Sequence, residues 1–197
     1  MDAVTVAAVV VAGIAVCALG YFFLAPSGIE TPAYRVLRAD GPFELRDYPA
    51  MVVAENHQAG SRRQAVQRGF LPLARYIFAR RRNGPRIAMT APVLQRPLAQ
   101  GWAIAFIMPA ALDPAVLPAP AGPSVRLRSI PSCQQASVRF SGVATDARLA
   151  EREQALRSWL ADRGLPSGGV AAYAYYNDPI TPGFLRRNEI LIEIEGG

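Results

Sequence analysis

The chain of 197 residues contains no lysine, and all 21 of its basic residues are arginine. Together with many alanines and prolines, this absence indicates the coding bias of a GC-rich bacterial genome rather than a function. His57 is the single histidine, so no site with two or three histidine ligands can form within one chain. The two cysteines, Cys17 and Cys133, have no Cys-x-x-Cys neighbour and no metal-ligand spacing, which argues against a disulfide framework.

Acidic residues are missing from a long stretch of the chain. Between Asn56 and Leu112 there is no Asp or Glu, whereas this stretch holds Arg62, Arg63, Arg68, Arg75, Arg80, Arg81, Arg82, Arg86 and Arg96. The basic excess behind the net charge of +6 is therefore local. Such an excess favours anionic partners, which include lipid headgroups, nucleic acid and acidic small molecules.

A long apolar run stands at the N-terminus. Residues 3–25 contain Thr5 as their one clearly polar side chain. A helix of this length spans the roughly 30 Å hydrocarbon core of a bilayer. We therefore expect residues 1–26 to form a single-pass membrane anchor, followed by a linker at 27–33 and a domain at 34–197. A cleaved signal sequence is the alternative, although the positive start typical of such sequences is missing.

The side of the membrane is indicated only by the residues that flank this run. Arg35 and Arg38 follow it, and no basic residue precedes it. The positive-inside rule then favours a cytoplasmic domain behind the anchor. Cleavage of the run would instead give a periplasmic or secreted protein.

Alternating and helical patterns follow one another along the rest of the chain. Helices are expected at 61–78 and 145–163, because apolar residues recur there every three or four positions and Thr145 is suited to cap the second helix. The interior Pro72 predicts a kink or a later start in the first helix. Strands are expected at 34–38, 43–46, 51–58, 87–94, 102–108, 125–130, 135–140, 170–176 and 188–194.

The order of these elements repeats. Each half consists of strands, one helix and two further strands, which is a β-α-β-β duplication without recognisable sequence identity. The sequence therefore predicts an α+β fold with an antiparallel sheet and two flanking helices, preceded by one N-terminal transmembrane helix. In the uncharged strand expected at 87–94, alternation would place Ile87, Met89 and Ala91 on one core face.

Residues suited to catalysis are few. His57 would share a strand face with Val53 and Glu55, where a structural role is the simpler interpretation. Neither a Gly-x-Ser-x-Gly elbow nor a phosphate-binding loop is present. Glu151 and Glu153 are two residues apart on a helix, so their side chains diverge. We expect no catalytic residue and no metal site.

The arginines also raise the question of nucleic acid. Specific nucleic-acid modules add stacking aromatics or a recognition helix to the charge, whereas Phe70, Tyr76 and Phe78 have the spacing of a helix core. We therefore expect no nucleic-acid partner. A flat amphipathic anion, held by apolar side chains with arginine at the rim, fits the pattern better.

Several stretches, taken in order over about residues 30–195, resemble the SOUL haem-binding protein family. They are Glu30–Leu37, Phe43–Tyr48, Arg75–Phe78, Ile87–Val93, Leu117–Pro120, Val138–Gly142 and Arg186–Ile190. The resemblance implies a barrel-like antiparallel sheet flanked by two helices and built from β-α-β-β halves, similar to the effector-binding domains of bacterial multidrug regulators. It also implies tetrapyrrole binding for some members.

The haem site implied by this resemblance carries over only in part. In one group of the family an axial histidine is proposed in the strand that matches Glu44–Tyr48, but this chain has Asp47 at that position. Other members are thought to hold haem by apolar and basic side chains on the first helix. The matching positions here are Gln67, Phe70, Ala74 and Arg75, with Arg68 as a substitute for the basic residue that Gln67 replaces.

The resulting prediction is non-catalytic, reversible binding of haem or a similar tetrapyrrole, without an axial histidine. Phe70 also fits an ordinary core position, and Arg75 also fits a surface charge. The rival is a membrane-surface or protein-interaction domain that meets anionic lipid through its arginines. A small-molecule hydrolase is a third hypothesis, and it is disfavoured because the sequence offers no clear nucleophile or base.

Overall fold

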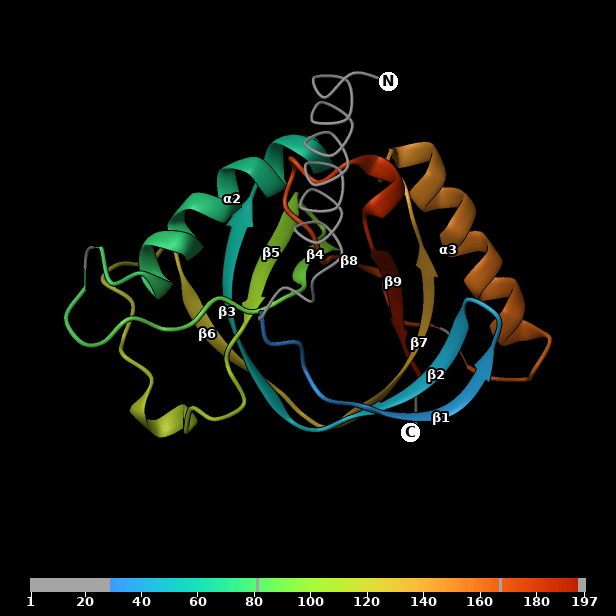
Figure 1. Cartoon of the computed structure of the whole chain (residues 1–197), viewed down its shortest axis with the longest axis horizontal. Coiled ribbons are helices and arrows are strands. Elements are labelled where there is room, and N and C mark those ends of the chain that lie inside the picture. Colours follow the sequence, from blue (N-terminus) through green and yellow to red (C-terminus); the bar gives the residue numbers. More distant parts are fainter. Residues whose placement is uncertain (1–28, 81, 167, 195–197) are drawn as a thin grey trace, which may run out of the picture.

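One antiparallel sheet organises the molecule. The computed structural model describes residues 29–194 except 81 and 167, and its nine strands pair in the order β1-β2-β7-β9-β8-β4-β5-β3-β6. The sheet curls into a barrel-like shape with one helix on each flank (Figure 1). The strands are β1 Arg35–Asp40, β2 Phe43–Tyr48, β3 Met51–Gln58, β4 Val93–Pro97, β5 Trp102–Ile107, β6 Arg126–Ile130, β7 Cys133–Phe140, β8 Ala172–Tyr175 and β9 Asn188–Glu193.

Two helices cover the outer face of this sheet. Helix α2, Arg62–Ile77, packs against β3 and β5, and helix α3, Asp146–Ala161, packs against β7 and β9. Ser61 caps α2 in a capping box with Gln64, and Thr145 caps α3, because each hydroxyl accepts a backbone N–H of the first turn. The later start that Pro72 suggested for α2 is not observed, since the helix runs from its cap through Pro72 to Ile77.

The predicted duplication is confirmed. One half is β3-α2-β4-β5 and the other is β7-α3-β8-β9, so each half has the order β-α-β-β. Arg62 joins the two halves at the start of α2, where it donates hydrogen bonds of 2.8 Å to the Tyr175 hydroxyl and to the Ala144 carbonyl. The same guanidinium pairs with Asp146 in the first turn of α3. The N-terminal ends of α2 and α3 accordingly converge (Figure 1).

The prediction of a strand at 87–94 is wrong over most of its length, because β4 begins only at Val93. The backbone before it bonds elsewhere: Ile87 N–H donates to the Ile77 carbonyl at the end of α2, and Ala91 N–H donates to the Glu30 carbonyl. Pro92, which has no N–H, cannot donate to a sheet ladder. The apolar character of this segment still reflects burial, since Ile87 packs into the core beneath α2.

Each helix closes its own apolar core. Under α2, Leu73 and Ile77 pack on Ile104 and Phe106 of β5. Under α3, the buried apolar side chains include Leu149, Leu156, Leu160, Val138, Ile190 and Ile192. Burial of each such side chain contributes roughly 1.5–3 kcal/mol, so the two cores fix both helices against the sheet.

The predicted membrane anchor at residues 3–25 lies outside the described residues. In the part of the chain that the structure describes, neither helix combines the length and the apolar character of a membrane span. The α+β domain that follows is the part whose surface and interior are described below.

Candidate functional site

The five residues that the resemblance assigned to haem binding all lie on α2, but not on one side of it. Phe70 is 39% exposed, and its ring meets the edge of Phe106 at 5.2 Å between centroids. Gln67 and Arg68 are exposed, Arg75 is half-buried, and Ala74 is buried. Phe70 and Arg75 are five residues apart, so they point about 140° away from each other around the helix axis.

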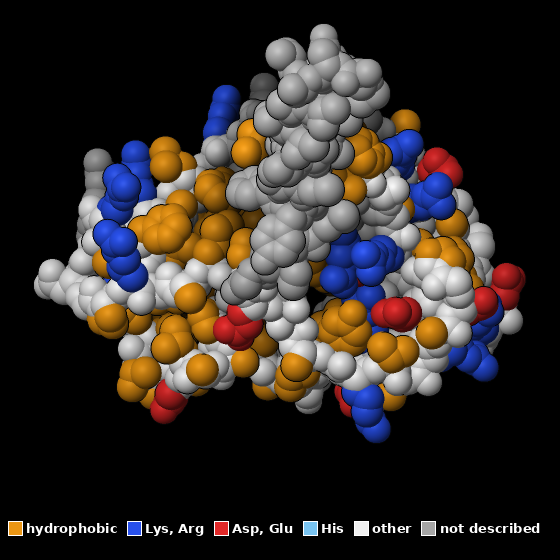
Figure 2. Space-filling model, viewed as in Figure 1, with side chains coloured by type: hydrophobic (Ala, Val, Ile, Leu, Met, Phe, Trp, Pro, Cys, Tyr) orange, Lys and Arg blue, Asp and Glu red, His pale blue; other side chains and the backbone are white. Residues whose placement is uncertain are grey.

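Exposed apolar side chains nevertheless extend from Phe70 around the helix toward the arginines. Leu71 is 51% exposed and Phe78 is 40% exposed, and their spacing of seven places them on the same outward side. We call Phe70, Leu71 and Phe78 the α2 patch; Arg68 and Arg75 stand at its edge, also seven residues apart. Apolar and basic side chains gather together over α2 in the space-filling view (Figure 2). Phe78 has the spacing that predicted a core position, so its exposure corrects that prediction, and Leu71 has no counterpart among the predicted site residues.

The arginine-rich turn after α2 is largely structural. The Arg82 guanidinium donates to three backbone carbonyls, those of Tyr76, Asn83 and Pro85, at 2.7 to 2.9 Å. It also lies over the Tyr76 ring, 5.1 Å from the centroid. Arg82 therefore stabilises the turn, whereas the Arg75 guanidinium beside it forms no hydrogen bond or ion pair with the residues that the structure describes. A small cavity of about 260 Å³ lies between Arg75, Arg82 and the segment around Pro120.

No histidine of the described chain reaches the α2 patch. Asp47, at the position matched to the axial ligand, pairs with Arg35 at 2.8 Å on the surface. His57 lies on β3, and its Nε2 is 2.7 Å from Glu55 Oε1. Alternation along β3 places both on the sheet face opposite α2, as expected from the sequence, while Ala54 faces the helix. A tetrapyrrole on the α2 patch would therefore be held by ring contacts and guanidinium groups alone.

The interior of the barrel-like sheet holds a larger cavity of about 550 Å³. Every strand from β2 to β9 contributes at least one side chain to its wall. The cavity exists because β5 directs Ala103 and Ala105 inward and Trp102, Ile104 and Phe106 toward α2. On β8, Ala172 likewise faces the cavity. Small residues on the inner face thus leave a hollow that lies within the usual volume of ligand pockets, roughly 300–1,000 Å³.

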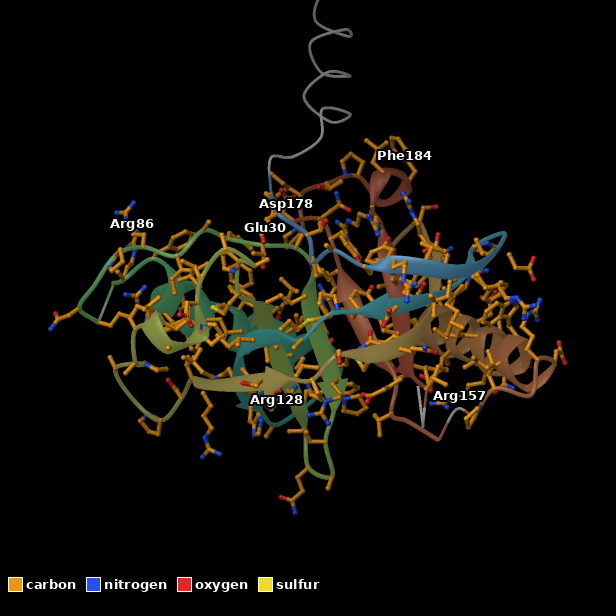
Figure 3. All side chains as sticks on the ribbon, turned by 90° about the horizontal axis from the view of Figure 1, so that it is seen from below. Glu30, Arg86, Arg128, Arg157, Asp178 and Phe184 are labelled. Atoms are coloured by element: carbon orange, nitrogen blue, oxygen red, sulfur yellow. The ribbon has the colours of Figure 1, made fainter. Side chains whose placement is uncertain are left out.

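Two carboxylates, Glu55 and Glu193, belong to the wall of this cavity. Glu55 accepts hydrogen bonds from the Arg128 guanidinium at 3.0 and 3.2 Å, in addition to its contact with His57. Burial alone would raise the pKa of Glu55, but the bonds from His57 and Arg128 outweigh it and hold that pKa below its usual range. Arg96 lies 4.0 Å from the same carboxylate. Arg128 is seen on the side of the molecule away from Phe184 and Glu30 (Figure 3).

A buried ionic network adjoins the cavity, and two of its members, Tyr48 and Tyr176, belong to the cavity wall. Arg46 of β2 and Glu189 of β9 are 2% and 0% exposed, and two bonds of 2.6 and 3.3 Å join them. Arg187 and the Tyr176 hydroxyl also donate to Glu189, at 2.9 and 3.0 Å. Burial alone would raise the pKa of Glu189, but Arg46 and Arg187 outweigh it and lower that pKa.

The family model described as SOUL heme-binding protein matches residues 29–193. Among curated proteins none matches the chain.

Solved structures share the fold at low identity. The C-terminal domain of EcmrR aligns with a TM-score of 0.59 and 13% identity, over 82% of this chain and 98% of that chain. A hydrolase from Listeria innocua aligns with a TM-score of 0.57 and 9% identity, over 81% and 94%. EcmrR in a complex with DNA aligns at 0.57 and 15%, over 78% of this chain and 57% of that one. At such identities the likeness shows the α+β architecture alone.

Proposed function

Because this chain belongs to the SOUL heme-binding protein family, we propose that it binds haem or a similar amphipathic tetrapyrrole reversibly on the α2 patch. The observation that carries this proposal is the exposure of three large apolar side chains on a helix with two arginines at their edge. A porphyrin is flat and apolar, with carboxylates at one edge. Phe70, Leu71 and Phe78 supply the apolar contact, and Arg68 and Arg75 pair with the carboxylates.

The proposed binding is non-catalytic. The Phe70 and Phe106 rings pack in a T-shaped arrangement, so the core fixes the position of Phe70 while part of its ring stays accessible. Gln67 is exposed three residues before Phe70 and extends that side of the patch with an uncharged group, whereas Ala74 is buried beneath it. His57 is engaged with Glu55 on the other sheet face, so no axial histidine is assigned.

A hemin titration tests this function. Hemin is added to the full chain, kept in one detergent throughout, and the Soret band is followed. We expect Phe70→Ala and Arg75→Ala each to weaken binding about tenfold, since each removes contacts worth roughly 1–2 kcal/mol. Arg139→Ala, which removes an exposed arginine of β7, is the matched control and should bind like the parent. Absence of binding, or equal binding by parent and both α2 variants, contradicts the proposal.

A second function is favoured by the direction of Leu71 and Phe78, which point outward from α2 rather than into a cleft. With the arginines of the acid-free stretch, they form a surface suited to an anionic bilayer. The apolar run at 3–25 would hold the domain next to that bilayer as a single-pass anchor, with the domain on the cytoplasmic side.

Liposome co-sedimentation separates this function from the first. Binding of the full chain to vesicles that contain anionic lipid should weaken as salt is raised, and Leu71→Asp should reduce it. If the run at 3–25 alone retains the protein on vesicles, neutral and anionic lipid will retain it equally and the substitution will have no effect. That result would exclude a role for α2 in membrane contact.

A further inference from the structure

The cavity inside the sheet is a second candidate site, separate from the α2 patch. Its apolar wall includes Met51, Leu94, Ala103, Ala105, Ile107, Ile130 and Leu191. These side chains come from strands that belong to both halves of the chain, so the hollow is a product of the complete sheet. The sheet itself stands between this hollow and α2, because the side chains that contact the helix alternate with those that line the cavity.

The charged side chains of this wall are Arg96, Arg128, Glu55 and Glu193, and its other polar side chains are Tyr48, Gln135 and Tyr176. Both guanidinium groups are partly exposed, at 38% and 44%, which places them at the mouth of the hollow. Apolar walls with a charged mouth fit an amphipathic ligand whose charged end stays near solvent.

The sign of the ligand charge follows from the hydrogen bonds at that mouth. Glu55 already accepts two bonds from Arg128 and contacts His57, so its negative charge is compensated within the protein. Arg96 differs from Arg128: within the described residues it has no hydrogen-bond partner, and its nearest carboxylate oxygen is 4.0 Å away. Its only ion pair within the described residues is this long contact with Glu55, so the Arg96 guanidinium keeps donors for a ligand, and a planar guanidinium is best matched by a carboxylate.

We propose that the cavity binds an apolar monocarboxylic acid, with the carboxylate paired to Arg96 and the hydrocarbon chain against Ala103, Ala105 and Ile107. The alanines of β5 leave the room for the chain, and the arginine of the neighbouring strand β4 receives the head. Because Ala103 and Arg96 are direct partners across the β4–β5 ladder, head and tail contacts are adjacent in the sheet. This site does not depend on haem binding at the α2 patch.

Calorimetry with three ligands that share an eight-carbon chain tests the proposal: octanoate, 1-octanol and octyltrimethylammonium, titrated into the full chain in one detergent. Octanoate should bind tightest, because it alone pairs with Arg96. Arg96→Gln should weaken octanoate about tenfold, roughly the strength of one charge-assisted hydrogen bond, and leave 1-octanol unchanged. Arg139→Gln, on an exposed strand position outside the cavity, is the matched control and should change nothing.

Two cavity-filling variants provide an independent arm. Ala103→Leu from β5 and Ala172→Leu from β8 should each abolish binding of all three ligands, because the added carbons occupy the space of the tail. Circular dichroism and thermal unfolding identify a variant that fails to fold. The binding measurement on the other variant then tests whether the tail occupies the cavity. The proposal is overturned if octyltrimethylammonium binds tighter than octanoate, if Arg96→Gln binds octanoate like the parent, if a folded filling variant retains binding, or if none of the three ligands binds.

Discussion

Arg46 and Glu189 show how a few residues of this chain are constrained across a long sequence distance. Both belong to stretches that carry the family resemblance, and Tyr34, Tyr48 and Arg187 from the same stretches surround them. The Arg46 guanidinium lies 4.3 Å from the centroid of the Tyr34 ring and donates to the Tyr48 hydroxyl at 3.1 Å. A buried charge of this kind is tolerated only because every neighbour is a partner. The network therefore gives these residues of the family stretches a structural role that needs no ligand.

At this scale we expect Arg46→Met to destabilise the fold by about 3–5 kcal/mol, since it leaves the Glu189 carboxylate buried without its main partner. Urea unfolding measures the change. Arg35→Met is the matched control: Arg35 lies on β1, is mostly exposed, and pairs with Asp47 at the surface, so its loss should cost less than about 1 kcal/mol.

The double variant Arg46→Met with Glu189→Leu removes both charges. It should recover much of the stability that the single variant loses, because a buried ion pair replaced by apolar groups of similar volume is often neutral. If Arg46→Met unfolds at the urea concentration of the parent, the pair has no structural role.

At the scale of elements, the approach of α2 to β5 depends on a single glycine. Gly69 lies in the middle of α2, where glycine costs about 1 kcal/mol relative to alanine. A Cβ at this position would come within 2.6 Å of Ile104 Cγ1 and 2.9 Å of Ile104 Cβ on β5. The close packing of helix and strand thus outweighs helix propensity here.

Gly69→Ala should for this reason lower the midpoint of thermal unfolding, although the same change in an exposed helix position raises stability. Overpacking of a filled core costs typically 1–3 kcal/mol, and that exceeds the gain in helix propensity. Gln67→Ala, on the exposed side of the same helix, serves as the control and should leave the midpoint unchanged or slightly higher. A Gly69→Ala variant as stable as the parent would mean that α2 can move away from β5 without loss.

At the scale of the whole molecule, the sheet separates the two proposed binding sites. The α2 patch lies outside it and the cavity inside it, and no side chain belongs to both. The two proposed ligands should therefore bind independently. Their independence distinguishes a patch-bound tetrapyrrole from one that occupies the interior.

Octanoate in excess should leave the hemin titration of the full chain unchanged, and Ala103→Leu should bind hemin like the parent. The same Soret measurement reports both results. Displacement of hemin by octanoate, or loss of hemin binding in a folded Ala103→Leu protein, would assign the tetrapyrrole to the cavity. The proposal for the α2 patch would then be wrong, and octanoate and hemin would be competitors for one site.

The local features of this protein could be read from the sequence. Helical periodicity with Ser61 and Thr145 at the starts gave both helices to within about two residues, because caps and apolar spacing act over one or two turns. Alternation correctly placed His57 and Glu55 on one strand face. The strand expected at 87–94 failed because its backbone groups bond to Ile77 and Glu30, which lie outside any local pattern.

The sequence by itself determined the element types, the β-α-β-β repetition, the family and the local excess of arginine, since each depends on neighbours along the chain. Only the tertiary structure decided which arginines have partners. It ties Arg82 to backbone carbonyls, buries Arg46 against a carboxylate 143 residues away, and leaves Arg96 at the mouth of a cavity. That cavity depends on the register that sets Ala103 beside Arg96. Strand register determines which side chains meet across a sheet, and this register cannot be derived from the spacing of residues along one strand.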